Sequence, residues 1–146
     1  MSDVNSPRKH TAEWPAVFLV AAELERRGYV ASIILNPNNP WADLMVGHPN
    51  TGEQFWVDVK GLRKSNAWTG KAKGERANLF YILVLVGKTR TGDRFFVLSQ
   101  ADFNGLVEQY QRDHPTAKPI GGFDWTDPHE FEDKWDKLPS WNVPSN

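Results

Sequence analysis

The sequence predicts an α/β fold in which a mixed central β-sheet is flanked by helices. Its length of 146 residues is typical of one domain. Its hydrophobic content of 40% and charged content of 24% are ordinary for a globular protein. The patterns follow the order helix, three strands, loop, two strands and two helices, which favours helices packed on one sheet. We therefore expect a single domain over residues 1–146, with a polar arm at 1–10 and a tail at 139–146.

The first helix is predicted over residues 14–27. Pro15 suits its first turn, where a missing backbone N–H costs nothing. Gly28, directly after two arginines, is typical of a helix C-terminus. Apolar side chains recur at helical spacing and give this helix one buried face: Val17, Val20, Ala21 and Leu24.

Three strands are predicted next, over residues 29–35, 41–46 and 54–60. The proline-rich loop 36–40 separates the first two strands. The turn at 48–52 joins the second and third strands, which we expect to pair antiparallel as a hairpin.

Side chains of the third strand point alternately to the two faces of the sheet. Phe55, Val57 and Val59 fall on one face and are predicted to face the core. On the opposite face, Asp58 and Lys60 are neighbours that point the same way.

The second half of the chain predicts a long loop, two more strands and two helices. The expected ranges are 62–78 for the loop, 79–86 and 94–98 for the strands, and 99–114 and 127–137 for the helices. Ser99 and Asp102 have the spacing of a capping box, which marks the start of the first of these helices.

The composition excludes several classes of protein. The chain has no cysteine, which excludes disulfides and thiolate metal sites and fits a reducing, cytoplasmic compartment. No apolar run approaches the roughly 20 residues that span a bilayer, and residues 1–10 lack the apolar segment of a signal peptide, so no membrane partner is expected. The net charge of −1 is unlike that of a protein that coats DNA, so any contact with nucleic acid must be local.

Two aspartates and a lysine carry the strongest chemical signal. If the hairpin forms, Asp43 comes close to Asp58, and Lys60 lies on the same face as Asp58. Two close carboxylates repel each other, and a divalent cation such as Mg²⁺, which takes oxygen ligands, relieves that repulsion. Lys60 can stabilise charge at a phosphate, or orient and deprotonate a water. The alternative is a solvated ion pair between Asp58 and Lys60, although the apolar neighbours of Asp58 are unlike an ordinary wet face.

With the preceding helix and strand, the segments PWADLMV and FWVDVKG resemble the PD-(D/E)XK nuclease superfamily, which has a restriction-endonuclease-like or Holliday-junction-resolvase-like fold. In this resemblance, Asp43 matches the first acidic position, Asp58 the second, and Lys60 the motif lysine. The resemblance implies a nuclease that depends on Mg²⁺ (or Mn²⁺), with Asp43, Asp58 and the carbonyl of Val59 as metal ligands. It also implies a nucleic-acid partner, either DNA or RNA, of which DNA is the first expectation.

Two features depart from the family pattern. Many members carry a glutamate on the first helix, which we would expect near Val17, and a valine cannot bind metal. Glu13 lies one turn earlier on the same face and can substitute, or it can simply be a favourable acid in the first helical turn. The family also places a helix after the motif lysine, where the segment 62–78 looks too polar and rich in glycine.

The segment 62–78 is locally basic and contains one tryptophan. Cations beside an aromatic ring can grip a phosphate backbone and stack on a base. The alternative is a solvated loop. The expected substrate contacts in this segment are Arg63, Lys64, Trp68, Lys71 and Lys73.

The sequence therefore supports two functions. The first is a metal-dependent nuclease that hydrolyses phosphodiester bonds, with Glu13, Asp43, Asp58 and Lys60 as its catalytic residues. The second is a non-catalytic module on the same fold that binds nucleic acid or protein. Neither function fixes the oligomeric state, and a homodimer is one option.

Overall fold

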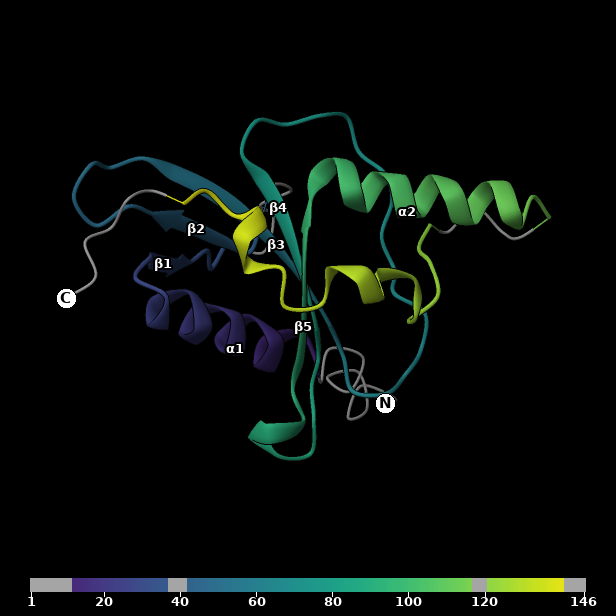
Figure 1. The fold of residues 1–146 in the computed structure, drawn as a ribbon, viewed down its shortest axis with the longest axis horizontal. Helices are drawn as coiled ribbons and strands as arrows, with labels where there is room; N and C mark the ends of the chain where they lie inside the picture. The colour runs from purple at the N-terminus through teal and green to yellow at the C-terminus, as the bar shows by residue number, and fades with distance from the viewer. Residues whose placement is uncertain (1–11, 37–41, 117–120, 141–146) are drawn as a thin grey trace, which may run out of the picture.

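The computed structural model describes residues 12–36, 42–116 and 121–140. Within them, a five-stranded sheet has the order β1-β2-β3-β4-β5, in which β3 and β4 run parallel and all other neighbours run antiparallel (Figure 1). The predicted α/β class with a mixed sheet is confirmed. The elements are α1 (Glu13–Arg26), β1 (Val30–Ile33), β2 (Leu44–Gly47), β3 (Gln54–Leu62), β4 (Leu79–Leu85), η2 (Arg90–Gly92), β5 (Arg94–Ser99), α2 (Gln100–Asp113), η3 (Asp127–Phe131) and η4 (Trp135–Lys137).

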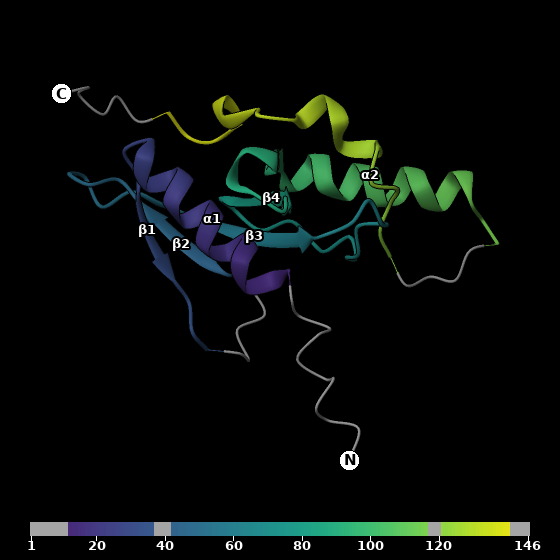
Figure 2. The ribbon, with the colours of Figure 1, turned by 90° about the horizontal axis from the view of Figure 1, so that it is seen from below.

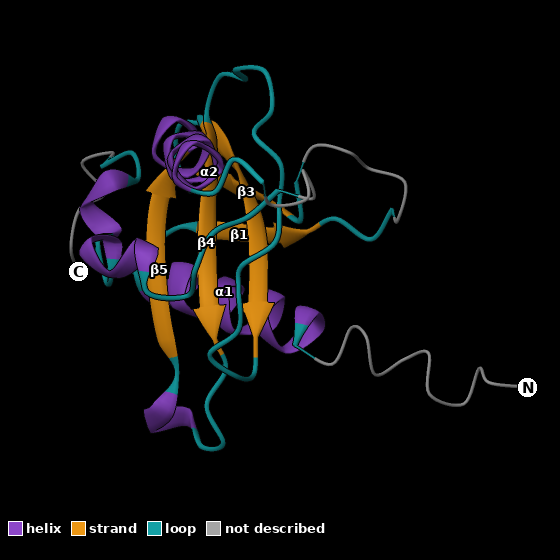
Figure 3. Cartoon of the chain, turned by 90° about the vertical axis from the view of Figure 1, so that its right-hand side faces the viewer, coloured by secondary structure: helices purple, strands orange, loops and turns teal. Residues whose placement is uncertain are grey.

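The two long helices cover opposite faces of the sheet, as Figures 2 and 3 show. On the α1 face, Val20 and Leu24 pack with Phe55, Val57 and Val59 of β3. On the α2 face, a second core forms around fully buried aromatic and aliphatic side chains: Trp68, Tyr81, Leu83, Phe96, Leu98, Phe103 and Phe123. The predicted alternation of β3 is therefore confirmed, because Phe55, Val57 and Val59 are all buried in the α1 core.

The C-terminal segment closes the free edge of β5. Glu132 forms an isolated antiparallel bridge with Phe96, and the Asp133 N–H donates to the Phe95 carbonyl at 2.9 Å. The same segment carries Trp135 into the α1 core, where its ring contacts that of Phe95. An edge strand covered in this way does not offer its backbone groups to another chain.

Several predicted boundaries differ from the structure. The first strand is shorter than 29–35, while β3 continues past residue 60 to Leu62. The helix predicted over 127–137 is in fact two short 3₁₀ helices, interrupted where Asp133 adopts a φ of 55°. The capping box between Ser99 and Asp102 is confirmed by reciprocal hydrogen bonds of 3.0 and 2.9 Å.

Some sequence predictions fall outside the described residues. These are the arm at 1–10, residues 37–40 of the predicted loop 36–40, the first residue of the strand predicted over 41–46 and the end of the predicted tail at 141–146. The start of that tail is anchored, because the Tyr29 hydroxyl donates to the Pro139 carbonyl at 2.7 Å. Among the described helices, none has both the length and the apolar character needed to cross a membrane.

The crossover from β3 to β4, residues 63–78, contains no helix, as predicted. It is nevertheless tied to its surroundings. Trp68 forms an isolated antiparallel bridge with Phe123, with hydrogen bonds of 2.9 and 3.1 Å in the two directions. The bridge needs glycine beside it, since a Cβ at Gly122 would lie 2.1 Å from the Trp68 carbonyl oxygen.

Two amide side chains of α2 fasten the next part of this crossover. Asn104 accepts from the Lys73 N–H at 3.2 Å and donates to the Lys73 carbonyl at 2.7 Å. Gln100, one helical turn earlier, donates to the Gly74 carbonyl at 3.1 Å and accepts from the Arg76 N–H at 2.7 Å. Residues 73–76 are therefore paired with the helix much as a strand is paired with its neighbour.

Candidate active site

Asp43 lies immediately before β2 and extends the pairing of β2 with β3. Its backbone N–H donates to the Val57 carbonyl at 2.9 Å. Its carboxylate Oδ2 accepts from the Val59 N–H at 2.7 Å, beyond the point where β2 offers a partner. The side chain therefore satisfies a backbone donor that the sheet leaves over, which fixes the position of the carboxylate.

Asp58 is the most buried acidic side chain of the site, with 7% of its surface exposed. The Lys60 ammonium lies 3.1 Å from Asp58 Oδ1, and the Lys73 ammonium lies 3.9 Å from Oδ2. The Lys60 contact lacks hydrogen-bond geometry, so Oδ1 has no hydrogen bond from any described residue. The two lysines balance the charge of this carboxylate, and Oδ1 keeps lone pairs with which it could accept a hydrogen bond or bind a cation.

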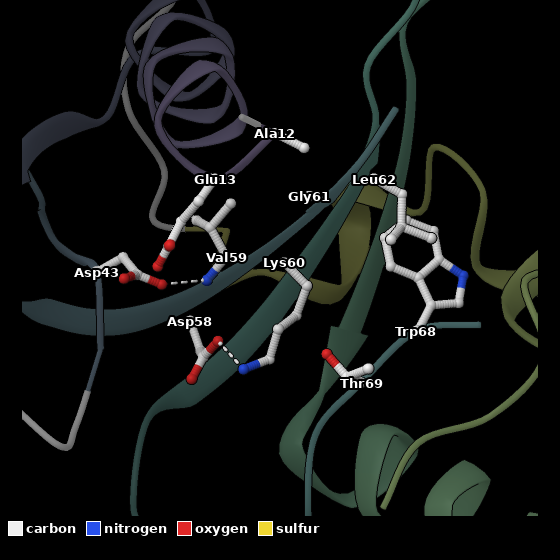
Figure 4. A pocket seen from close by; sticks show the side chains of 10 residues that line it. All are labelled: Ala12, Glu13, Asp43, Asp58, Val59, Lys60, Gly61, Leu62, Trp68 and Thr69. Atoms are coloured by element: carbon white, nitrogen blue, oxygen red, sulfur yellow. Dashed lines mark hydrogen bonds and ion pairs between the residues drawn. The ribbon is translucent and has the colours of Figure 1, made fainter. Parts of the chain in front are cut away.

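Glu13, the first residue of α1, lies in the same region as Asp43 and Asp58. The N-terminal turn of α1 packs so closely on β3 that a Cβ at Gly61 would lie 2.3 Å from the Ala12 carbonyl oxygen. In Figure 4 the Glu13 side chain points toward the Asp43 carboxylate, while Lys60 extends beside Asp58. The glycine after the motif lysine is therefore what allows the helix to deliver Glu13 to this position.

These side chains line one open cleft of about 400 Å³ (Figure 4). The cleft contains all four predicted catalytic residues, together with Val59. Its lining is Ala12, Glu13, Asp43, Asp58, Val59, Lys60, Gly61, Leu62, Trp68 and Thr69.

The charges in the cleft interact. Burial raises the pKa of Asp43 from 3.8 to about 6, while the hydrogen bond from the Val59 N–H lowers it. The negative charges of Asp58 and Glu13 raise the Asp43 pKa further, and the positive charge of Lys60 lowers it. Burial is thus the main reason that Asp43 resists ionisation, and the like charges of Asp58 and Glu13 add to it.

The donor set fits a hard divalent cation. Asp43 and Asp58 provide carboxylate oxygens, and Asp58 Oδ1 has no hydrogen bond from the described chain. The carbonyl of Val59 lies on the same side of β3 as the N–H that meets Asp43, because both groups of a strand residue face the same neighbour. Within the described residues no three His, Asp or Glu side chains are grouped closely enough to enclose a metal. A cation here would thus keep water or substrate oxygens among its ligands, as Mg²⁺ commonly does.

The predicted substrate contacts are only partly brought to the cleft. Lys73 lies next to Asp58, whereas Arg63, Lys64 and Lys71 are exposed on the crossover and do not line the cleft. The prediction that Trp68 stacks on a base is wrong. Its side chain is only 1% exposed, its ring contacts Phe96, and its indole N–H donates to the Trp125 carbonyl at 3.3 Å.

Sequence reasoning missed three residues that shape the site. Gly61 admits the helix, and Asn104 holds the backbone of Lys73. Tyr81 is the β4 register partner of Asp58, and its buried hydroxyl has no hydrogen bond within the described residues. Burial and the charge of Asp58 raise the pKa of Tyr81 to about 12. Only Gly61 had a local signal, because it directly follows the Asp-Val-Lys motif.

Comparisons with known protein families, curated proteins and solved structures find no match to this chain.

Proposed function

We propose that this protein is a metal-dependent nuclease with a restriction-endonuclease-like fold that hydrolyses phosphodiester bonds in nucleic acid, with DNA as the first substrate to test. The observation that carries the proposal is the meeting of Asp43, Asp58 and Lys60 in one cleft, with Glu13 delivered from α1. Paired carboxylates and a lysine are the groups that phosphodiester hydrolysis with a metal requires.

In this proposal each residue of the cleft has a role that follows from its functional group. Asp43, Asp58 and the Val59 carbonyl would hold Mg²⁺ or Mn²⁺, which when bound polarises a phosphate oxygen and makes water more acidic. Lys60 stabilises the negative charge that develops on the phosphate, because its ammonium already lies in the cleft beside Asp58. Glu13 accepts a hydrogen bond from the attacking water and orients it, since its carboxylate lines the same cleft.

The first test compares cleavage by the wild-type protein and by Asp58→Asn, with single-stranded and duplex DNA and RNA and with Mg²⁺ or Mn²⁺. The amide removes a charge from the cation site while preserving shape, so cleavage should fall by more than roughly a hundredfold, the loss that even an outer-shell partner of a metal can cause. Glu13→Gln should also lose activity by orders of magnitude while its fold and metal binding stay intact.

The control is Asp136→Asn, which changes an exposed carboxylate outside the cleft. It should cleave like the wild type. Titration calorimetry with Mn²⁺ adds a second readout, in which Asp58→Asn should lose binding. Equal metal affinity in the wild type and Asp58→Asn would contradict the proposal.

A second function is favoured by one observation. Lys60 and Lys73 already lie against the two oxygens of Asp58, so this carboxylate is compensated without a cation. A non-catalytic module that binds nucleic acid or protein needs no more than that. This second function would be favoured if neither the wild type nor Asp58→Asn cleaved single-stranded or duplex DNA or RNA.

A further inference from the structure

An exposed aromatic pair lies at the start of α1, next to the cleft. Trp14 and Phe18 are one helical turn apart, with 47% and 58% of their surfaces exposed. Their ring centroids are 5.9 Å apart and the ring planes are tilted by 30°. Large aromatic side chains are normally well buried, so two neighbouring exposed rings indicate a binding surface.

Of this pair, Trp14 adjoins the cleft through a second hollow. A smaller hollow shares Glu13 and Asp43 with the cleft, and its remaining wall is apolar. That wall consists of Trp14, Val17, Ile33 and Ile34. A ligand bound at the carboxylates therefore has an aromatic surface within reach on the α1 side.

Charge is distributed asymmetrically around the carboxylates. In Figure 4 the Glu13 and Asp43 side chains lie together, and the Lys60 side chain extends toward the Asp58 carboxylate. Lys73, at 3.9 Å from Asp58, adds a second cation from the crossover. One cation thus comes from β3 and one from the crossover, whereas the exposed rings come from α1.

We propose that Trp14, extended by Phe18, is a stacking platform for an unpaired base next to the phosphate held in the cleft, so that the substrate is a single-stranded nucleic acid. The inference rests on the proposed function and names its substrate class. Phosphates fit the lysine side and base faces fit the aromatic side. In a duplex the base faces are already stacked on one another, so an aromatic platform offers it little.

The test measures binding of a short fluorescein-labelled oligothymidylate, a blunt duplex of equal length and an abasic oligonucleotide. Ca²⁺, which takes the same kinds of oxygen ligands, replaces Mg²⁺. Trp14→Ala should weaken binding of the oligothymidylate by roughly 5- to 100-fold, the worth of one stacked base. Trp14→Phe should recover most of that binding, and the abasic strand should bind both proteins equally.

The matched control is Val30→Ala, which trims a side chain that is also 47% exposed but belongs to β1. It should not change binding. Circular dichroism verifies that each variant is folded.

Three outcomes would overturn the inference. They are equal affinity for the duplex and the single strand, an equal effect of Trp14→Ala on the abasic strand, or a wild-type dimer that Trp14→Ala dissociates in sedimentation experiments. The last outcome would make the rings an interface between two copies of this chain.

The same experiments separate this inference from the proposed function. If binding depends on Trp14 but the protein cleaves no nucleic acid, the base platform is supported and the nuclease function is contradicted. If cleavage depends on Asp58 but not on Trp14, the nuclease function is supported and the base platform is contradicted.

Discussion

The carboxylate of Asp43 both bonds to the backbone and faces the cleft. Its Oδ2 accepts from the Val59 N–H, which is a structural contact, and the same carboxylate faces the cleft with Glu13. Burial disfavours its charge and raises its pKa to about 6. In the metal-free protein this acid is therefore mostly ionised at pH 7 and gains a proton as the pH falls through about 6, and a cation in the cleft would favour its ionised form.

The first prediction concerns the stability of Asp43→Asn. A pKa raised above the unfolded value means that Asp43 stabilises the fold below about pH 4, and that this stability is lost as pH rises through about 6. The asparagine can still accept from Val59 but never ionises. Relative to the wild type, the metal-free variant should therefore melt at progressively higher temperature as pH increases from 4 to 7.

Thermal melts between pH 4 and 8, with and without Mn²⁺, measure this directly. Mn²⁺ at pH 8 should stabilise the wild type more than the variant, and its apparent affinity should weaken below about pH 6 because protons compete for Asp43. A constant difference in melting temperature over the whole range would show that Asp43 does not titrate in this window.

At the scale of elements, the contact between α1 and β3 controls the site. The start of the helix rests on Gly61, where a Cβ would also lie 2.7 Å from the Ala16 Cβ. Neither the Ala12 backbone nor the buried Ala16 methyl group can move aside easily to make room for such a Cβ. The glycine thus fixes where Glu13 and Trp14, the first two residues of the helix, project.

Gly61→Ala should push the N-terminal turn of α1 away from β3. We expect a destabilisation of about 1–3 kcal/mol, the usual cost of overpacking. Cleavage should decrease more than the loss of folded protein explains, because Glu13 moves with the turn. Denaturant unfolding and single-turnover cleavage, measured on the same preparation, separate the two effects.

Gly105→Ala is the control, since Gly105 lies within α2 and a Cβ there meets nothing within 4 Å. This change should leave cleavage unaltered and stabilise the protein by about 0.5–1 kcal/mol, because alanine favours a helix over glycine. Equal activity in Gly61→Ala and Gly105→Ala would mean that the helix position does not matter to the site.

At the scale of the whole molecule, the net charge of −1 hides a local excess of cations. The crossover between β3 and β4 concentrates them, and the α2 amides hold one of them, Lys73, at the cleft. A protein with so little net charge gains no general attraction to nucleic acid, so its affinity should depend on a few local contacts.

Replacing Lys71 and Lys73 with alanine should weaken binding of single-stranded DNA and flatten its salt dependence. Each phosphate contact contributes about 0.7 to the slope of log affinity against log salt for a single strand, so the slope should decrease by up to about 1.4. Lys134→Ala, which removes an exposed charge on the C-terminal segment, is the control. An unchanged slope in the double variant would exclude the crossover from the binding surface.

Local rules were sufficient for a large part of this protein. The alternation of Phe55, Val57 and Val59 decides which face of β3 is buried and hence that Asp58 and Lys60 share the other face. The capping box at Ser99 and the order of the elements are also readable from residues close together in sequence. Such features depend on neighbours a few positions away, and backbone geometry fixes those relations in advance.

Contacts between distant segments required the tertiary structure. Trp68 was predicted to bind substrate from its basic neighbours, but pairing with Phe123, 55 positions later, turns its ring into the core. Lys73 lies near Asp58 on a backbone segment that the Asn104 side chain holds through two hydrogen bonds. Nothing near either residue encodes these partners, because loop closure brings them together and packing selects which of the possible contacts forms. The sequence by itself determined that Asp58 and Lys60 share one face of β3, because alternation along a strand is a local rule. The tertiary structure decided that Lys73 lies beside them and that Trp68 is buried, because both depend on segments distant in sequence.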